Sequence, residues 1–343
     1  MKYYDLKDNK YFGLFGSDTL DEEGYNRFSQ LERKKIASIN KDVSYLATNS
    51  AGILAKFITN SKKVVVKAKL NDKPNMAHMP ATGQCGMDLY VYDENIHDYA
   101  LLDVTMLDIN KDEYEIDLGH FTTNKNRRYI LHLPLYIGVK EIYIALDDEA
   151  IVYSDKFNNN ERIVVYGTSI TQGGCVSRPG MLHTNILSRW LDYEFLNYGF
   201  SGSAFAEKEI AEIVGKRKNT KLLIIDVEAN AGIDERMEEN LPIFLQEYKK
   251  YQPKVPIILT SRILFALDLY NQERVKLREF YHNFLVSLTK KYNELGEKMY
   301  FLDGSKFFAD NFTEYTVDGI HPTDLGSWAI AKAYNNFLRK VLP

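Results

Sequence analysis

A serine, an aspartate and a histidine occupy positions from which they could perform acyl transfer. Ser169 lies in the segment 164–173, an apolar run that ends in a turn of small residues. Asp318 and His321 lie far downstream, three residues apart. A serine hydroxyl becomes a useful nucleophile when a nearby base takes its proton. The combination predicts an enzyme that cleaves esters through a serine.

Two further candidates, Gly202 and Asn230, also follow apolar runs. Gly202 closes the segment 197–202, and Asn230 comes just after the run 222–227. In parallel sheets, ligands bind beyond the carboxyl ends of the strands. We therefore expect these residues to lie near Ser169.

The second half of the chain alternates between apolar and amphipathic segments. Runs without internal polar alternation indicate strands buried on both faces, as in a parallel sheet covered by helices. This pattern predicts an α/β domain over residues 162–343. The expected strands are 163–166, 195–198, 222–227, 256–260 and 299–302, and the expected helices are 204–216, 235–251, 272–293 and 324–341.

The first 155 residues have a different sequence pattern, in which apolar and polar residues alternate and helical periodicity is rare. Polar turn-forming segments separate the expected strands. Two half-apolar sheets bury their faces against each other, so the pattern predicts an antiparallel β-sandwich over residues 1–155, followed by a polar linker at 157–161. The clearest strands are 64–70, 87–92, 128–133 and 141–146.

Composition excludes several classes of protein. The net charge of −4 provides no basic field, so nucleic acid is not an expected partner. No apolar run approaches the roughly 18 residues that span a bilayer, so no membrane partner is expected. The first residues contain no apolar stretch of signal-peptide length, which predicts a cytoplasmic protein. The oligomeric state stays open, with a homo-oligomer among the alternatives.

The two cysteines, Cys85 and Cys175, are too few for a disulfide or metal framework. They fall in different expected domains, so a bridge between them is poorly motivated. Cys175 lies six residues after Ser169 and is an alternative nucleophile, but no base-like motif accompanies it. The remaining histidines have no partner at metal-ligand spacing, and we predict neither a metal nor a cofactor. These histidines are His78, His97, His120, His132, His183 and His282, of which His183 is a candidate for the pocket.

The motifs together resemble the SGNH (GDSL-type) hydrolase family. Its blocks are matched here by residues 167–170, 197–202, Asn230 and 318–321, in the family's order. The resemblance covers roughly residues 162–340 and implies a flavodoxin-like three-layer α/β/α domain. Residues 86–90, Gly-Met-Asp-Leu-Tyr, look like the GxDLY signature of β-rich, jelly-roll-like domains that precede one branch of these esterases.

The resemblance also assigns roles. Ser169 would be the nucleophile, His321 the base, and Asp318 the acid that orients the imidazole. The oxyanion hole would consist of the backbone N–H groups of Ser169 and Gly202 and the side-chain amide of Asn230. Residues that bind the rest of the substrate are not predicted.

The sequence departs from the family pattern at two places. Thr168 and Ile170 replace the aspartate and leucine that flank the serine in the family. These replacements change the local packing but not the nucleophile. The block usually written GxND is Glu228-Ala229-Asn230-Ala231 here, so only the asparagine is kept. Glu228 is interpreted as a structural carboxylate in preference to a catalytic acid.

The predicted function is hydrolysis of a short acyl ester, acetyl by preference, on a carbohydrate or other small polar molecule. Two alternatives stay open. One is an acyltransferase that uses the same acyl-serine intermediate, because the sequence does not reveal whether the pocket excludes water. The other is a carbohydrate-binding protein whose hydrolase domain has lost its activity.

Overall fold

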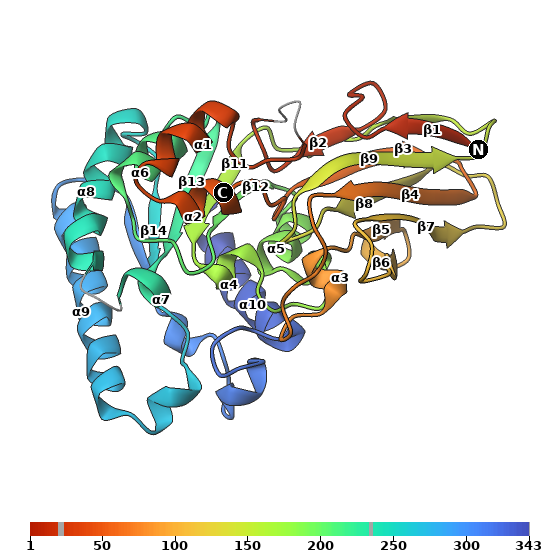
Figure 1. Cartoon of the computed structure of the whole chain (residues 1–343). Coiled ribbons are helices and arrows are strands. Elements are labelled where there is room, and N and C mark those ends of the chain that lie inside the picture. Colours follow the sequence, from red (N-terminus) through yellow and green to blue (C-terminus); the bar gives the residue numbers. More distant parts are fainter. Residues whose placement is uncertain (20–23, 233–235, 343) are drawn as a thin grey trace.

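The chain forms two regions of different architecture (Figure 1). The computed structural model describes residues 1–19, 24–232 and 236–342. One region is an antiparallel β-sandwich with the amino terminus at its far end, and the other is a parallel sheet flanked by helices. This confirms the predicted fold class.

Two antiparallel sheets make up the sandwich, and their facing sides enclose a core that includes Phe57, Val66 and Leu131. Alternate side chains are buried over residues 66–70, as the alternating pattern predicts. The first sheet is ordered β1 (Lys2–Asp5), β9 (Val139–Leu146), β4 (Lys63–Leu70) and β7 (Glu113–His120). The second is ordered β10 (Val152–Ser154), β3 (Leu54–Thr59), β8 (Arg127–His132), β5 (Asp88–Asp93) and β6 (Asp98–Val104), with β2 (Gly13–Phe15) also paired to β3.

The parallel sheet has its strands in an order in which the second strand of the domain lies outside the first. That order, 2-1-3-4-5, is the flavodoxin-like one, in which the site lies beside the first strand. Val164 and Tyr166 of the first strand pack on one side, and Ile163 and Val165 on the other. The strands are β12 (Glu194–Gly199), β11 (Arg162–Gly167), β13 (Thr220–Asp226), β14 (Ile257–Thr260) and β15 (Met299–Leu302).

Helices cover both faces of this sheet (Figure 1). One face packs against α6 (Lys208–Gly215), α8 (Arg236–Tyr251) and α9 (Gln272–Glu294), and the other against α5 (His183–Leu191) and α10 (Asp324–Val341). Short helices α3 (Ala81–Gln84), α4 (Ser169–Gln172) and α7 (Glu228–Ala231) lie in connections, as do the 3₁₀ turns at Pro179–Met181, Ala266–Leu269, Gly304–Lys306 and Phe312–Tyr315.

One helix begins several residues after the position expected from the sequence. The segment 204–216 becomes helical only from Lys208, because Ala206 has a φ of 57° and lies in a left-handed conformation that ends helical geometry. The helix expected from Glu235 begins at Arg236 among the described residues, and Glu235 itself lies outside them.

The alternating pattern of the first 155 residues did not reveal the short helix α3 or two longer helices, α1 (Gln30–Ala37) and α2 (Lys41–Leu46). A capping box between Ser29 and Glu32 begins the first of them. Their apolar residues, including Ile36 and Val43, belong to the same core as the parallel sheet. This part of the amino-terminal half therefore packs as a component of the hydrolase region, and the sandwich consists of the strands around it.

A buried arginine fastens this segment to the parallel sheet. Arg27 is completely buried, and its guanidinium donates to the carbonyls of Asn197 and Gly199 at 3.2 and 2.6 Å. It also donates to the carbonyls of Leu46 and Asn49. Burial lowers the pKa of Arg27 to about 9. The arginine thus fixes the end of β12, which leads directly into the turn that contains Gly202.

A second junction joins the sandwich to the loop that follows α4. Asp88 is fully buried and accepts hydrogen bonds from the Arg178 side chain at 3.0 Å and the Gly180 amide at 2.7 Å. Its other carboxylate oxygen lies 2.9 Å from Nδ1 of the equally buried His132. Arg178 also donates to the Tyr90 hydroxyl. The Asp88 and Tyr90 side chains of the 86–90 motif therefore hold the two regions together.

None of the helices in the described ranges is both long enough and apolar enough to cross a membrane.

Candidate active site

Ser169 begins the short helix α4, directly after β11 ends at Gly167. Thr168 occupies the N-cap position in an extended conformation, which turns the chain sharply from strand to helix. The serine is 7% exposed. Its amide belongs to the first turn of the helix, where N–H groups have no intrahelical acceptor. Both the hydroxyl and the amide of Ser169 are therefore available at the carboxyl edge of the sheet.

The structure brings the three distant residues into one hydrogen-bonded series. Ser169 Oγ lies 2.9 Å from His321 Nε2, and His321 Nδ1 lies 2.7 Å from Asp318 Oδ2. The two contacts use opposite nitrogens of the ring. The carboxylate can only accept, so Nδ1 carries the proton and Nε2 is left as the acceptor for the serine hydroxyl. This is the tautomer that a general base requires.

Asp318 is held in the orientation that this series needs. Its second oxygen accepts from the amides of Ile320 and His321, at 3.0 and 2.8 Å. Partial burial by itself would raise the pKa of Asp318, but the hydrogen bonds from the His321 amide and ring outweigh burial, and the pKa is lowered. Gly319 has a φ of 85°, which lets the chain fold back over so short a span. Asp318 thus stays ionised next to the imidazole.

Asn230 is hydrogen-bonded to Ala204, which lies two residues after Gly202. The Ala204 amide donates to Asn230 Oδ1 at 3.3 Å, which leaves the NH₂ end of that side chain as a donor. Gly202 lies in a turn with a φ of 68°, and an added Cβ would meet nothing within 4 Å. The space around its backbone is open to a substrate.

Two family models match the chain and together span most of it. The GDSL-like lipase/acylhydrolase model matches residues 160–339, which is more than half of the chain. The chain belongs to the GDSL-like lipase/acylhydrolase family. Residues 1–152 match the model for the N-terminus of SGNH hydrolase-type esterases, in agreement with the motif at 86–90. No curated protein matches this esterase in sequence.

Solved structures resemble most or nearly all of the chain. A protein described as a GDSL-like lipase from Bacteroides ovatus is 27% identical with a TM-score of 0.89, covering 99% of this chain and 98% of its own. The salicylyl-acyltransferase SsfX3, from a tetracycline biosynthetic pathway, is 16% identical with a TM-score of 0.81 and coverage of 99% and 97%. A family two carbohydrate esterase from Clostridium thermocellum is 11% identical with a TM-score of 0.61 and coverage of 85% and 93%. Family and fold together make this protein a carboxylic ester hydrolase.

Two buried amides that the sequence analysis gave no role support the site of this esterase. Gln172 accepts from the Ser201 amide at 3.0 Å and donates to the Leu135 carbonyl at 3.2 Å. Asn197 donates to the Thr171 carbonyl at 2.6 Å. Both residues therefore tie α4 to the end of β12 and the turn that follows. The position of Gln172, three residues after the serine, was the available signal.

Glu228 is a structural carboxylate in this esterase, as interpreted from the sequence. It accepts from the Arg262 amide at 2.9 Å and lies 3.5 Å from the Arg262 side chain. Burial raises the pKa of Glu228 to about 7, although the Arg262 amide and charge oppose the shift. The contact fastens α7 to the loop after β14. Since α7 carries Asn230, the residues that replace the family's GxND block still define its position.

Other candidates in the sequence have different surroundings. Cys175 is buried, and burial, followed by the charge of Asp318, raises the pKa of its thiol to about 12. A protonated thiol is a weak nucleophile, so the Ser169 hydroxyl is the better candidate. His183 lies inside the core and stacks on Tyr334, with ring centroids 6.1 Å apart, which removes it from the pocket lining. Cys85 and Cys175 are both free.

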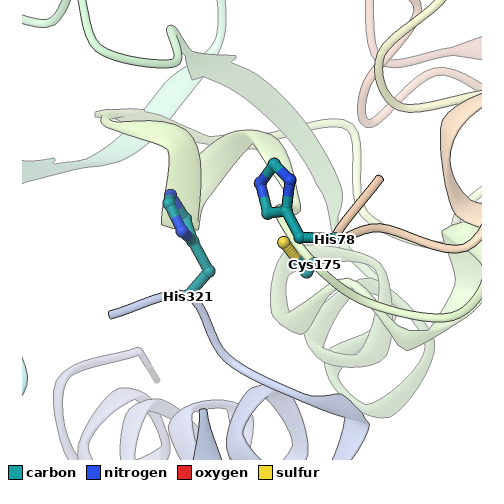
Figure 2. Close-up of side chains that lie close together, drawn as sticks. All are labelled: His78, Cys175 and His321. Carbon is teal, nitrogen blue, oxygen red and sulfur yellow. The ribbon is translucent and has the colours of Figure 1, made fainter. Parts of the chain in front are cut away.

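The amino-terminal half also places a histidine beside the site. His78 belongs to the loop before α3, and its ring centroid is 5.9 Å from that of His321. Figure 2 shows His78, Cys175 and His321 converging from three segments of the chain. Nothing in the sequence spacing indicates this proximity, because 243 residues separate the two histidines in the numbering (321 − 78).

Proposed function

We propose that the protein removes short acyl groups, acetyl by preference, from a carbohydrate or other small polar alcohol. The observation that carries the proposal is the series Asp318–His321–Ser169, with contacts of 2.7 and 2.9 Å. The acyl group passes through an ester of Ser169 and then to water.

In the first step, Ser169 Oγ attacks the carbonyl carbon of the ester while His321 Nε2 takes the hydroxyl proton. The imidazolium that forms is stabilised by the ionised Asp318 on its other nitrogen. The C–O bond to the alcohol then breaks, and the departing oxygen receives the proton from His321. The product of this half-reaction is acyl-Ser169 and a free alcohol.

Attack places a negative charge on the carbonyl oxygen. Stabilising this charge requires hydrogen-bond donors that already point toward the position of that oxygen. The amides of Ser169 and Gly202 and the NH₂ group of Asn230 are the proposed donors. Such fixed dipoles cost no reorganisation when the charge appears, and losing one typically lowers the rate by ~10²–10³. The Asn230 Oδ1 contact to Ala204 supports this orientation of the amide.

In the second step, His321 accepts a proton from water, and the resulting hydroxide attacks acyl-Ser169. Collapse of the intermediate breaks the bond to Oγ and returns the proton from His321 to the serine. A carboxylic acid leaves, and the enzyme is restored.

The substrate class is supported by the fold neighbours. Esterases of carbohydrate esterase family two share this fold, and one of them was crystallised with cellohexaose. A polar alcohol with several hydroxyls is therefore the proposed leaving group.

The acyltransferase alternative has one specific support, the full-length fold similarity to a salicylyl-acyltransferase. It uses the same acyl-Ser169, which an alcohol or amine would attack in place of water. Product analysis with candidate acceptors separates the two. An inactive carbohydrate-binding protein is disfavoured because the serine, histidine and aspartate keep their hydrogen-bonded arrangement.

The experiment is a turnover screen of p-nitrophenyl esters of increasing acyl length, followed by acetylated sugars. We expect the highest kcat/KM for acetyl, free acid as the main product, and loss of turnover in Ser169→Ala with the fold intact by circular dichroism. A fluorophosphonate probe should label Ser169 in the unaltered chain. Unchanged turnover in Ser169→Ala would reject the mechanism, and a preference for long acyl chains would reject the substrate class alone.

A further inference from the structure

We propose that His78, Cys175 and His321 form a zinc-binding site that blocks the esterase by occupying its catalytic base. One ligand atom from each residue lies within 4.8 Å of the others. Figure 2 shows the three side chains projecting into a common space. The donors are two imidazole nitrogens and one sulfur, a set that suits Zn²⁺ and is unsuited to Mg²⁺ or Ca²⁺.

The separation of the donors is close to what the ion needs. Tetrahedral Zn²⁺ places its nitrogen and sulfur ligands roughly 3.3–3.8 Å apart. Reaching that spacing from within 4.8 Å requires a movement of about 1 Å. His78 is exposed, so rotation of its side chain can supply this movement without disturbing the core.

His321 already has the environment of a metal-ligating histidine. Its Nδ1–H donates to Asp318 at 2.7 Å, which leaves the Nε2 lone pair as an acceptor, here for the Ser169 hydroxyl at 2.9 Å, and Zn²⁺ would take the place of that hydroxyl proton. A carboxylate on the far nitrogen is the usual partner of a zinc-bound imidazole, because it fixes the tautomer and increases the basicity of the ligand. The feature that makes His321 a base therefore also makes it a good ligand.

Backbone contacts keep the cysteine beside this imidazole. The Cys175 amide donates to the carbonyl of Pro322, the residue after His321, at 3.2 Å. Cys175 is 3% exposed and belongs to a small apolar cluster that also contains Met79. Met79 follows His78 directly, so packing against Cys175 brings the second imidazole to the same place.

The loop that carries His78 is held in place by the buried side-chain amide of Gln84. Gln84 accepts from the amides of Asn75 and Met76, at 2.9 and 3.0 Å. It donates to the carbonyls of Met76 and Met79, at 2.9 and 2.6 Å. Four hydrogen bonds from one side chain thus fix the loop on both sides of His78, which limits the entropy lost when a metal binds.

Binding of Zn²⁺ would remove catalysis by a direct route. The Cys175 thiol loses its proton to solvent, and the cation supplies the opposite charge that the buried thiolate otherwise lacks. His321 Nε2 then donates its lone pair to the metal and can no longer accept the proton of Ser169 Oγ. A water molecule can complete the coordination. The inhibited form is fully reversible on chelation.

The test begins with binding measured apart from turnover. Calorimetric titration of ZnCl₂ into Ser169→Ala, which keeps all three donors, should give one high-affinity ion per chain. Introducing His78→Ala or Cys175→Ala into that background should weaken the affinity for Zn²⁺ by at least about tenfold. Mutation of a residue that only supports a ligand typically weakens metal affinity by about 10–100-fold, and loss of a ligand itself should cost no less. The exposed His120, which lies on β7 and pairs with Asp117, provides the matched control His120→Ala, with unchanged affinity.

The second measurement is inhibition of the unaltered enzyme on p-nitrophenyl acetate. Zn²⁺ should inhibit at the concentrations at which it binds, EDTA should restore the rate, and Mg²⁺ should have no effect. His78→Ala should raise the inhibition constant by the same factor as the dissociation constant. His78 is at the surface, so this variant tests the idea even if Cys175→Ala does not fold.

Either of two results would overturn the proposal. One is the absence of a high-affinity ion on Ser169→Ala, and the other is equal affinity with and without His78. Because binding is measured on a variant without the nucleophile, failure of the proposed acetyl or carbohydrate specificity leaves this test unaffected.

Discussion

Two of the aspartate–histidine pairs of this esterase, Asp318–His321 and Asp88–His132, differ in the group that faces the second ring nitrogen. Asp318 and His321 lie at the edge of the parallel sheet, with side chains 34% and 21% exposed. Asp88 and His132 lie in the sandwich with side chains 0% exposed. In both pairs Nδ1 faces the carboxylate, at 2.7 and 2.9 Å. In the first pair Nε2 faces a serine hydroxyl, and in the second it faces the Arg189 guanidinium at 3.2 Å.

The same two side chains can serve as a base or as a structural contact, depending on their surroundings. Burial lowers the pKa of His132 more than the Asp88 hydrogen bond raises it, so the ring stays neutral. Its Nε2 accepts from Arg189 and cannot serve a substrate. Burial alone would raise the pKa of Asp88, but the contacts with His132 and Arg178 outweigh burial and lower it. The buried pair therefore stabilises the junction, while the other pair can move a proton.

Removing the imidazole proposed to be the catalytic base, that of His321, should produce the largest effect. We expect His321→Ala to lower kcat by ~10⁴ or more, because the nucleophile, base and acid act as a unit. Since the side chain is partly exposed, the unfolding midpoint in urea should change little. Steady-state kinetics and urea unfolding on the same preparation check both halves. A large loss of stability with retained kcat would reverse the roles given to the two pairs.

Removing the buried carboxylate of Asp88 should lower the stability of the fold, whereas removing the His321 imidazole should lower kcat. Asp88→Ala leaves Arg178 and the Gly180 amide without their buried partner, and breaking such a pair costs about 3–5 kcal/mol of unfolding free energy. The matched control is Asp93→Ala, at the half-buried end of the same strand, with a loss below about 1 kcal/mol. Equal stability of the two variants would show that the Asp88 cluster does not hold the regions together.

The proposed oxyanion donor provides a third test on the catalytic side. Asn230→Ala should lower kcat by ~10²–10³ with little change in KM, because the amide acts only when the oxyanion develops. Asn240→Ala removes a hydrogen bond to the Phe205 carbonyl in the neighbouring loop and controls for general loosening. If the Asn240 variant loses as much kcat as the Asn230 variant, Asn230 acts by positioning the loop.

Lowering the pH should reduce the free energy of unfolding gradually, and by less than the Asp88→Ala substitution does. The pKa of His132 is lowered in the folded protein, whereas the unfolded chain takes up that proton below about pH 6.5. The unfolded state then binds more protons, so stability is full above that pH and falls as the pH decreases toward the folded pKa. His183 contributes with the same sign, since burial lowers its pKa to about 4.

Urea unfolding at pH 7, 6 and 5 measures this dependence. Each such histidine contributes at most about 1.4 kcal/mol per pH unit. His132→Gln and His183→Gln should each flatten the slope, while His120→Gln, on an exposed side chain, should leave it unchanged. A slope in His132→Gln identical to that of the unaltered chain would show that His132 does not stay neutral when folded.

The sequence predicted much of the fold because burial pattern is a local property. The five parallel strands were placed within about two residues of their observed ends, since each is a continuous apolar run. The sandwich was predicted from alternation, but β1, β2, β3, β6, β7 and β10 were not assigned individually. Helices α1 and α2 were missed because they are short and begin with polar turns that resemble loops.

The candidate site was predicted in its chemistry and only partly in its construction. Ser169, Gly202 and Asn230 follow strand ends, and parallel strands bring such ends together. Arg27 and Gln172, which fix those turns, could not be found in this way, since each acts through backbone groups distant in the chain. Every residue has the same backbone groups, so residue type does not indicate which of them a distant side chain contacts.

The reactive groups and the two architectures can be predicted from the sequence, because residue type and periodicity are local properties of the chain. The group that each reactive side chain contacts depends on the tertiary structure. The group that faces Nε2 of each histidine, Ser169 for His321 and Arg189 for His132, is distant from that histidine in the sequence. The approach of His78 to Cys175 and His321 is of the same kind. Contacts between distant segments depend on how layers pack, and packing sums many weak interactions that no short stretch of sequence contains.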